Sequence, residues 1–298
     1  MQDDVAECIK KDYVAVVGTS EYFAFFSGQT GRAALNNISG LDDIFSGGMM
    51  GPGSGDGYVR RGIETMERNS DYANKMMFAA QAVRGLQINS AGADFKTLIY
   101  FTAGYTSAQL AAIQTAGAAH ASPGRTFAIN STDALITKLN EASFPGDSCS
   151  RRIWRMDLYS HGVPDDLAFG YNGRNAGARS FTASHASRLD RERYDNHGTP
   201  GRIYSWACRT AISGSGAHGG LAQSMANATR ATVYAYARRT EYTNTWNTGG
   251  QTAAQAGLTE IAGSGSRVLW HPDGARRGVI EGTSPAGNRS GQFSFTSQ

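Results

Sequence analysis

TLIYFTAGYTSAQL, at Thr97–Leu110, carries two structural signals on either side of one glycine. Its first part, TLIYFT, is a short and largely apolar run, which is typical of a buried strand. Gly104 ends the run, and Thr106 and Ser107 then supply side chains that commonly cap the start of a helix. This helix is expected to extend through Gln114. The stretch therefore predicts a strand that is followed directly by a helix.

The same alternation continues towards the carboxyl terminus. Further strands are predicted at Thr126–Asn130, Ile153–Tyr159, Arg202–Ala207, Ala231–Ala237 and Val268–Trp270. Helices are predicted between several of these strands, over residues 131–142 and 221–229. Strands that alternate with helices favour an α/β fold, in which a mostly parallel central sheet is flanked by helices. In sheets of this kind, ligands lie beyond the carboxyl ends of the strands.

The first part of the chain, residues 1–92, lacks this alternation. It contains the apolar run Tyr13–Val17, a Gly-rich stretch over residues 47–57, and apolar residues at helical spacing between Val59 and Leu86. The string GPGSGDG does not end in the Gly-Lys-Ser/Thr of a phosphate-binding loop, so a surface loop is the simpler interpretation. We therefore expect a partly helical N-terminal extension that packs against a main domain.

Composition and charge narrow the class of protein. The chain has 298 residues, of which 40% are hydrophobic and 18% charged, which fits a folded globular protein. Its net charge of +3, without a basic stripe, argues against nucleic acid as a partner. No apolar run reaches the about 18 residues that cross a bilayer, so no membrane span is expected.

The first residues, MQDDVAECIKKDY, lack the apolar core of a signal peptide. We therefore expect synthesis in the cytoplasm and, for an exported form, a route that needs no cleaved leader. Cys8 and Cys149 could pair in an oxidising compartment, but the sequence cannot show this, so they are interpreted as bystanders. The remaining histidines lack the spacing of metal ligands, so no metal is expected.

Two predicted strands end in residues that can carry covalent catalysis. The strand at 153–159 is followed by His161 and Gly162, and the strand at 202–207 by Cys208. If these strands are neighbours, both side chains face one crevice. A thiol attacks as thiolate, which a nearby imidazole favours, and the imidazole then protonates the leaving amine. The N–H groups of Gly162 and Cys208 would stabilise the oxyanion.

These residues resemble the caspase-like cysteine peptidases, a group that includes caspases, metacaspases, legumains and gingipains. WACRT at 206–210 is similar to the caspase signature Q-A-C-[RQG]-G, and His161 lies roughly 50 residues upstream of Cys208, as in caspases. The SHG strand end, the small hairpin with LAFG, and VYAYARRTEYTNTW at 233–246 are also similar. The resemblance covers about residues 95–250.

The resemblance implies a caspase-like sandwich, with residues 1–92 as the N-terminal extension and 93–298 as the peptidase domain. It also implies hydrolysis of peptide bonds in a protein or peptide substrate through a thioester on Cys208, without a cofactor. The arginine-rich, lysine-poor composition with much glycine and alanine suggests a bacterial origin, and the lack of a signal peptide would fit a secreted effector. Caspase-like enzymes are often activated by cleavage in linkers, so we expect residues 170–201, which are Gly-rich and Arg-rich, to be an exposed loop. Self-processing there, or an activating partner, is a hypothesis.

Some positions depart from the caspase pattern. Trp206 and Thr210 replace the glutamine and the second glycine, so the match is to the wider group. The caspase Ser-Trp-Arg element reads Thr-Trp-Asn at 245–247, so aspartate specificity is not implied. The candidate substrate-binding residues are Glu241, Arg238, Arg239, Trp246 and Asp165. A carboxylate at Glu241 would favour a basic or small neutral residue before the scissile bond, whereas an inward-facing arginine would favour an acidic one.

Simpler interpretations exist for both catalytic candidates. A free cysteine is usually a small buried hydrophobe, and His-Gly is usually a turn. One alternative is therefore a catalytically silent caspase-like scaffold that binds a partner protein. Another keeps the same site but performs amide or acyl transfer on a non-protein substrate.

Overall fold

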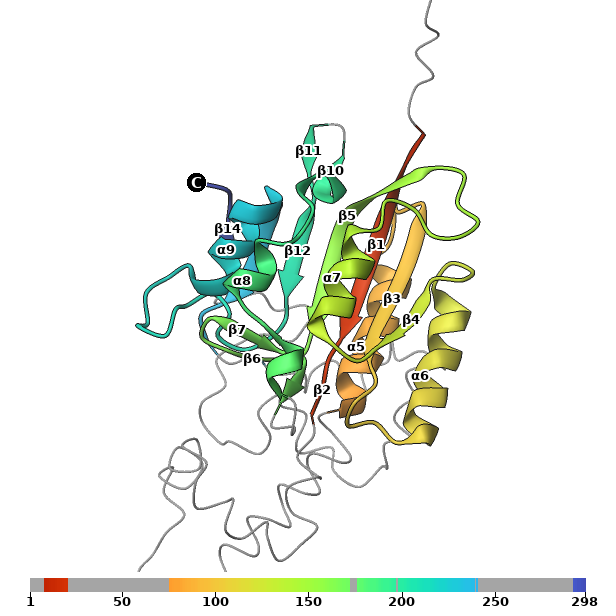
Figure 1. The fold of residues 1–298 in the computed structure, drawn as a ribbon, viewed down its shortest axis with the longest axis horizontal. Helices are drawn as coiled ribbons and strands as arrows, with labels where there is room; N and C mark the ends of the chain where they lie inside the picture. The colour runs from red at the N-terminus through yellow and green to blue at the C-terminus, as the bar shows by residue number, and fades with distance from the viewer. Residues whose placement is uncertain (1–7, 21–74, 172–175, 197, 239, 241–291) are drawn as a thin grey trace, which may run out of the picture.

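The central feature is a seven-stranded sheet (Figure 1), seen in a computed structural model that describes residues 8–20, 75–171, 176–196, 198–238, 240 and 292–298. The strand order is β14-β13-β12-β5-β1-β3-β4, and only the edge pair β13–β14 is antiparallel. The strands are β1 (Ile9–Val17), β3 (Phe95–Phe101), β4 (Thr126–Ile129), β5 (Ser150–Tyr159), β12 (Arg202–Ser205), β13 (Thr232–Tyr236) and β14 (Gln292–Phe295). The predicted mostly parallel sheet is confirmed.

Helices cover both faces of this sheet and bury a separate core on each. One core contains residues of α5 (Lys75–Ile88) and α6 (Ser107–His120), and the other contains residues of α7 (Thr132–Asn140), α8 (Ala183–Ala186) and α9 (Gly220–Thr229). Along β1, Tyr13, Ala15 and Val17 face the first core, while Val14 and Val16 face the second. This alternation is the side-chain period of a strand that is buried on both faces.

The predicted helix starts are confirmed at α6 and α7. Thr106 caps α6 in a capping box with Gln109, and Ser131 caps α7 by accepting a hydrogen bond from the Ala134 amide at 3.2 Å. Helix α6 extends to His120, beyond the expected end at Gln114, because its later residues Ala116 and Gly117 pack against the sheet. The caps are local signals, whereas the end of α6 depends on tertiary packing.

Strand β1 shows that the N-terminal part of the chain belongs to the central sheet. It lies between β5 and β3 in the middle of the sheet, so the expected division at residue 92 does not separate two structural units among the described residues. The run Tyr13–Val17 is not followed closely by a predicted helix, so the alternation of strands and helices did not reveal it as a strand of this sheet. Helix α5 confirms the last part of the expected helical stretch, whereas residues 59–74 lie outside the described residues.

The carboxyl-terminal part contains one unexpected strand. Strand β14 pairs antiparallel with β13 and forms an edge of the sheet, although no alternating pattern had predicted a strand there. The strand expected at Val268–Trp270 lies outside the described residues.

The expected hairpin after His161 is confirmed, whereas the exposed loop over residues 170–201 is not. β6 (His161–Val163) and β7 (Asp166–Ala168) form an antiparallel pair, and β9 (Ser180–Phe181) adds a third strand. Residues 170–201 also contain β8 (Gly170–Tyr171), which pairs with β2 (Thr19–Ser20), and η2 (Ala176–Arg179), α8, η3 (Arg191–Tyr194), β10 (Asp195–Asn196) and β11 (Thr199–Pro200). Phe181, Ala186, Leu189 and Tyr194 enter the core, which a count of glycines and arginines could not reveal.

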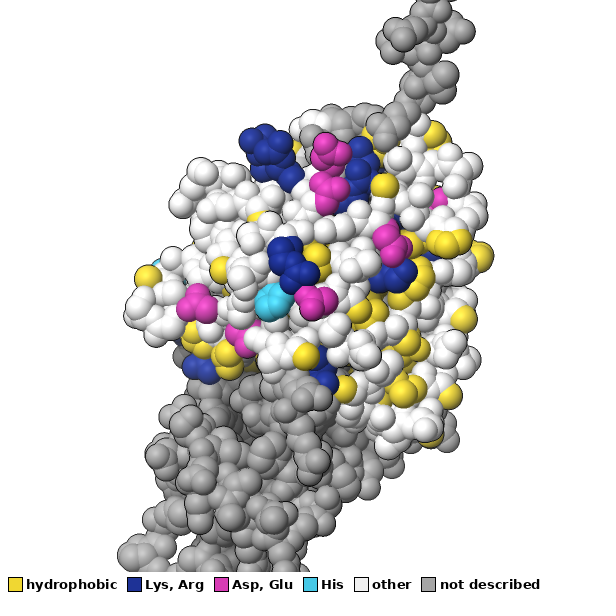
Figure 2. Space-filling view, in the orientation of Figure 1, with side chains coloured by type: hydrophobic (Ala, Val, Ile, Leu, Met, Phe, Trp, Pro, Cys, Tyr) yellow, Lys and Arg dark blue, Asp and Glu magenta, His cyan; other side chains and the backbone are white. Residues whose placement is uncertain are grey.

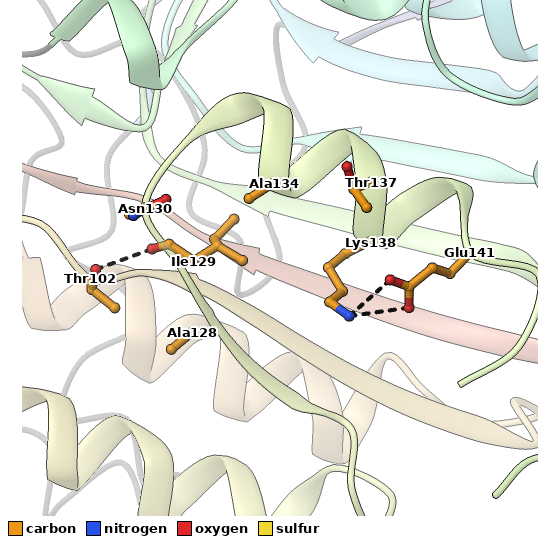
Figure 3. Close-up of a pocket in the computed structure, with 8 residues that line it drawn as sticks. All are labelled: Thr102, Ala128, Ile129, Asn130, Ala134, Thr137, Lys138 and Glu141. Atoms are coloured by element: carbon orange, nitrogen blue, oxygen red, sulfur yellow. Dashed lines mark hydrogen bonds and ion pairs between the residues drawn. The ribbon is translucent and has the colours of Figure 1, made fainter. Parts of the chain in front are cut away.

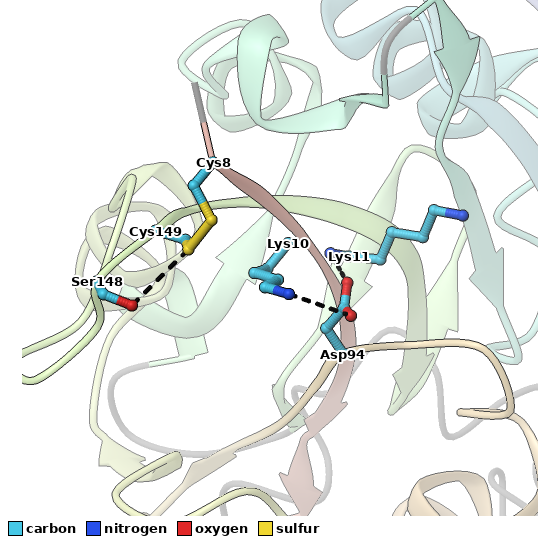
Figure 4. The surroundings of a disulfide bond; sticks show 6 residues. All are labelled: Cys8, Lys10, Lys11, Asp94, Ser148 and Cys149. Atoms are coloured by element: carbon cyan, nitrogen blue, oxygen red, sulfur yellow. Dashed lines mark hydrogen bonds and ion pairs between the residues drawn. A yellow bond between two sulfur atoms is a disulfide. The ribbon is translucent and has the colours of Figure 1, made fainter. Parts of the chain in front are cut away.

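A disulfide joins Cys8 to Cys149 (Figure 4), so the interpretation of these residues as bystanders was wrong. The bond links the residue before β1 to the residue before β5, which are adjacent parallel strands. It therefore ties together segments that are 141 residues apart in sequence. Among the described residues, no helix is long and apolar enough to cross a membrane.

A buried charge cluster lies near the same amino end of the sheet. The Asp12 carboxylate pairs with the Arg151 guanidinium at 2.8 Å and the Arg125 guanidinium at 3.5 Å, and it accepts a hydrogen bond from Thr97. Burial raises the pKa of Asp12, while the two arginines act in the opposite direction. Arg151 also donates to carbonyl oxygens in the last turn of α7, including that of Leu139 at 3.1 Å.

Candidate active site

The two strands that lead to the catalytic candidates are neighbours in the sheet. β5 and β12 pair in parallel with Leu158 opposite Ser205, and the Trp206 amide donates to the Leu158 carbonyl at 3.0 Å. The carboxyl ends of parallel strands lie at the same end of a sheet. His161 and Cys208 therefore follow two strands that end next to each other. The condition on which the predicted site depended, that these strands lie side by side, is met.

Gly162 brings the two chain segments into direct backbone contact. A Cβ atom at this position would lie 2.4 Å from the carbonyl oxygen of Cys208 and 2.8 Å from the Cβ of Ala207. Both distances are too short for a real side chain, so this close approach requires glycine. The hairpin that begins with His161 therefore packs directly on the chain at Cys208.

His161 is fully buried at the start of β6. The Phe78 ring of α5 meets its imidazole in a T-shaped arrangement, with the centroids 5.2 Å apart. An edge-to-face contact of this kind restricts the orientation of the imidazole. The sequence did not single out Phe78, because no local pattern relates a residue of this helix to His161.

Cys208 is also fully buried, and its sulfur lies against Thr240. The Thr240 amide donates to Sγ at 3.3 Å, the Thr240 hydroxyl lies 3.6 Å from Sγ, and the Thr240 carbonyl oxygen lies at 3.9 Å. The same hydroxyl donates to the Trp206 carbonyl oxygen at 2.7 Å. Thr240 was not among the sequence candidates, because no pattern relates it to Cys208.

The chain turns sharply directly after Cys208. Arg209 has a φ of 55°, in the left-handed region that is uncommon for residues other than glycine. Its amide donates to the Arg238 carbonyl at 3.0 Å, and the Ala211 amide donates to the Tyr236 carbonyl at 3.0 Å. Such conformations persist only where the surroundings hold them, and they cluster at functional sites.

The predicted substrate-binding residues have different outcomes. Asp165 has a φ of 65°, and its carboxylate accepts a hydrogen bond from the Gly214 amide at 2.7 Å, which ties the hairpin to the loop after Cys208. Arg238 follows β13 close to Cys208, and its side chain is exposed. Glu241, Arg239 and Trp246 lie outside the described residues.

The two departures from the caspase signature have structural explanations. Trp206 is buried and stacks on Tyr204, with centroids 5.9 Å apart, and it also contacts the Tyr236 ring at 6.1 Å. The Thr210 hydroxyl lies 2.8 Å from the Ser205 hydroxyl, and both are buried. Both side chains are larger than those of the caspase pattern, and they support the turn around Cys208 from within the core.

Other surface features lie away from this site. An open pocket between β4 and α7 (Figure 3) is lined by Thr102, Ala128, Ile129, Asn130, Ala134, Thr137, Lys138 and Glu141. On the face in Figure 2, basic and acidic side chains are interspersed rather than gathered by sign. Within the described ranges, no group of three or more His, Cys, Asp and Glu side chains is arranged to hold a metal ion.

Comparison with protein-family models, with curated proteins and with solved structures finds no significant match to this chain. The functional interpretation therefore rests on the geometry of the site. That geometry joins a histidine and a cysteine through adjacent parallel strands and one glycine contact.

Proposed function

We propose that the chain is a caspase-like cysteine endopeptidase, with Cys208 as nucleophile and His161 as acid and base. The observation that carries this proposal is the backbone contact of Gly162 with Cys208 at the joined carboxyl ends of β5 and β12. This contact places a thiol and an imidazole on adjoining chain segments at the sheet edge where α/β proteins place their ligands.

The proposed reaction has two halves. The Cys208 thiolate attacks the scissile carbonyl carbon, and the N–H groups of Gly162 and Cys208 donate to the oxyanion that forms. His161 gives its proton to the leaving amine as the carbon–nitrogen bond breaks, which leaves a thioester. Water then attacks the thioester while His161 accepts a proton, and the thiolate and the new carboxyl group are released.

The site is closed in this structure, since the side chains of His161 and Cys208 are both fully buried. A peptide therefore reaches the sulfur only after the surroundings open. This supports the hypothesis of a separate activation step, which an activating partner or self-processing would supply.

The disulfide supports a further part of the proposal. Disulfides persist in oxidising compartments, so the Cys8–Cys149 bond favours a protein that functions after export. A role as an exported bacterial effector remains our hypothesis for this chain.

A second candidate is a catalytically silent scaffold that binds a partner protein. The complete burial of Cys208 favours it, because a structural cysteine is usually buried. An electrophilic thiol probe separates the two: an enzyme is labelled selectively at Cys208 in the folded state once its site has opened, whereas a silent scaffold is labelled only on unfolding. Selective labelling without cleavage of any peptide would instead indicate amide or acyl transfer on a non-protein substrate.

The direct test is a diverse peptide library incubated with the wild type and with Cys208→Ala. We expect cleavage by the wild type and none by the variant, with the same circular dichroism spectrum for both. Peptides that differ only in Arg, Leu or Asp before the scissile bond then test the preference expected from Glu241 for a basic or small neutral residue. Turnover by a correctly folded Cys208→Ala protein would refute the mechanism.

A further inference from the structure

Thr240 contacts the Cys208 sulfur in a way that packing alone does not require. Its backbone N–H points at Sγ over 3.3 Å, while its hydroxyl donates to the Trp206 carbonyl at 2.7 Å. The hydroxyl therefore anchors residue 240 to the chain just before Cys208, and the anchored residue presents its N–H to the sulfur. Thr240 is almost completely buried, so water does not compete for these bonds.

A hydrogen bond to a thiolate stabilises the charged form, and a buried donor does so more strongly than an exposed one. The neutral thiol has another partner on the same residue, since Sγ can donate to the Thr240 carbonyl oxygen at 3.9 Å. The amide contact is the shorter of the two and serves the ionised sulfur. Thr240 thus provides a bond for each protonation state.

We propose that Thr240 is a positioning residue for Cys208, whose anchored backbone N–H stabilises the thiolate. This inference concerns the nucleophile of the proposed peptidase and so builds on that function. Thr240 takes no part in bond breaking; it acts by fixing the sulfur and favouring its ionised form.

Other charged groups adjoin Cys208 and must be separated from this effect. Described titratable or charged residues on the neighbouring segments include His161 on the hairpin, Arg209 directly after Cys208, Arg238 after β13, and Asp165, which holds the following loop. A positive charge near the sulfur also favours a thiolate, and a carboxylate such as that of Asp165 opposes it. A variant at Thr240 leaves all of these groups unchanged.

The chain allows the ionisation of Cys208 to be observed directly. It has three cysteines, and Cys8 and Cys149 form the disulfide, so Cys208 is its one cysteine outside a disulfide. The ultraviolet absorbance of the thiolate, measured against pH with Cys208→Ser as the blank, therefore reports this residue alone. The measurement needs no substrate and no access of a reagent to the buried sulfur.

The test compares Thr240→Val, Thr240→Ser and the control Thr229→Val by this titration. Val removes the anchoring hydroxyl, so we expect the midpoint of thiolate formation to rise by about one pH unit. Ser keeps the hydroxyl and should retain the wild-type midpoint. Thr229 is equally buried and donates to the Met225 carbonyl at 2.7 Å, but it lies on α9, so Thr229→Val should alter stability alone.

An unchanged midpoint in folded Thr240→Val, or an equal shift in Thr229→Val, would overturn the inference. If Thr240→Val does not fold, Thr240→Ser still decides, because a shifted midpoint in that variant would contradict an anchoring role for the hydroxyl. For an active peptidase, the acidic limb of the kcat/KM profile of Thr240→Val should move with the thiolate midpoint. A shifted titration without cleavage of any peptide would support the role of Thr240 while refuting the peptidase.

Discussion

The two ends of the central sheet are held together by different means. At the amino end, the strands are linked through side chains. The Asp12 carboxylate forms ion pairs with two arginines, and the Cys8–Cys149 disulfide joins the segments that lead into neighbouring strands. At the carboxyl end, close backbone contacts join the segments, as where Gly162 packs on the Cys208 carbonyl and the Arg209 amide donates to the carbonyl of residue 238, and side chains such as Thr240 add to them. The strongest ties of the strands thus lie at the amino end and the proposed catalytic residues at the carboxyl end, so we expect substitutions at one end to leave the other unaffected.

The largest expected effect concerns activity at the carboxyl end. We expect His161→Ala to reduce kcat/KM by roughly 10⁴–10⁶-fold, nearly as much as Cys208→Ala, because residues that act as one unit are not additive. The double variant should be scarcely worse than either single one. Steady-state kinetics, with the free energy of unfolding as a control, test this. Losses that multiply would show that the two residues do not work together.

The next effect concerns stability at the amino end. Arg151→Met removes the closest partner of the buried Asp12 carboxylate and should lower the free energy of unfolding by about 3–5 kcal/mol. The matched control is Arg188→Met, since Arg188 forms an exposed pair with Asp133 and should cost less than about 1 kcal/mol. Urea denaturation measures both. A large loss of kcat/KM in folded Arg151→Met would break the proposed separation of the two ends.

Removal of the disulfide should have a somewhat smaller effect. A Cys8→Ser, Cys149→Ser double variant should lose about 2–4 kcal/mol of unfolding free energy, because the bond closes a long loop and restricts the unfolded chain. Thiol counting after denaturation should give one thiol in the wild type and three after reduction. A changed midpoint of Cys208 ionisation in the double variant would show that the amino and carboxyl ends of the sheet are not independent.

The smallest effect is a pH dependence of the Arg151 variant. A buried carboxyl with a raised pKa contributes stability below its unfolded pKa and loses that contribution as pH rises through the folded pKa. Loss of Arg151 removes an opposing influence and raises the pKa of Asp12 further. The stability deficit of Arg151→Met should therefore shrink by about 1 kcal/mol between about pH 7 and pH 4. A deficit that grows on acidification would show that the carboxylate is not the destabilised group.

Local patterns in the sequence determined much of the fold and the centre of the site. The apolar run at 97–102 predicted β3, and the caps at Thr106 and Ser131 predicted the starts of α6 and α7, because these signals depend on neighbours along the chain. The same alternation placed His161 and Cys208 at strand ends. Such patterns can be recognised in the sequence because the side-chain periods of strands and helices appear in consecutive residues.

Only the tertiary structure decided the rest. The place of β1 in the middle of the sheet, the disulfide, and the contacts of Phe78 with His161 and Thr240 with Cys208 all join distant segments. The described residues between 170 and 201 likewise join the core through Phe181 and Tyr194. No local period encodes which distant segment a residue will meet, since that depends on how all the elements pack together.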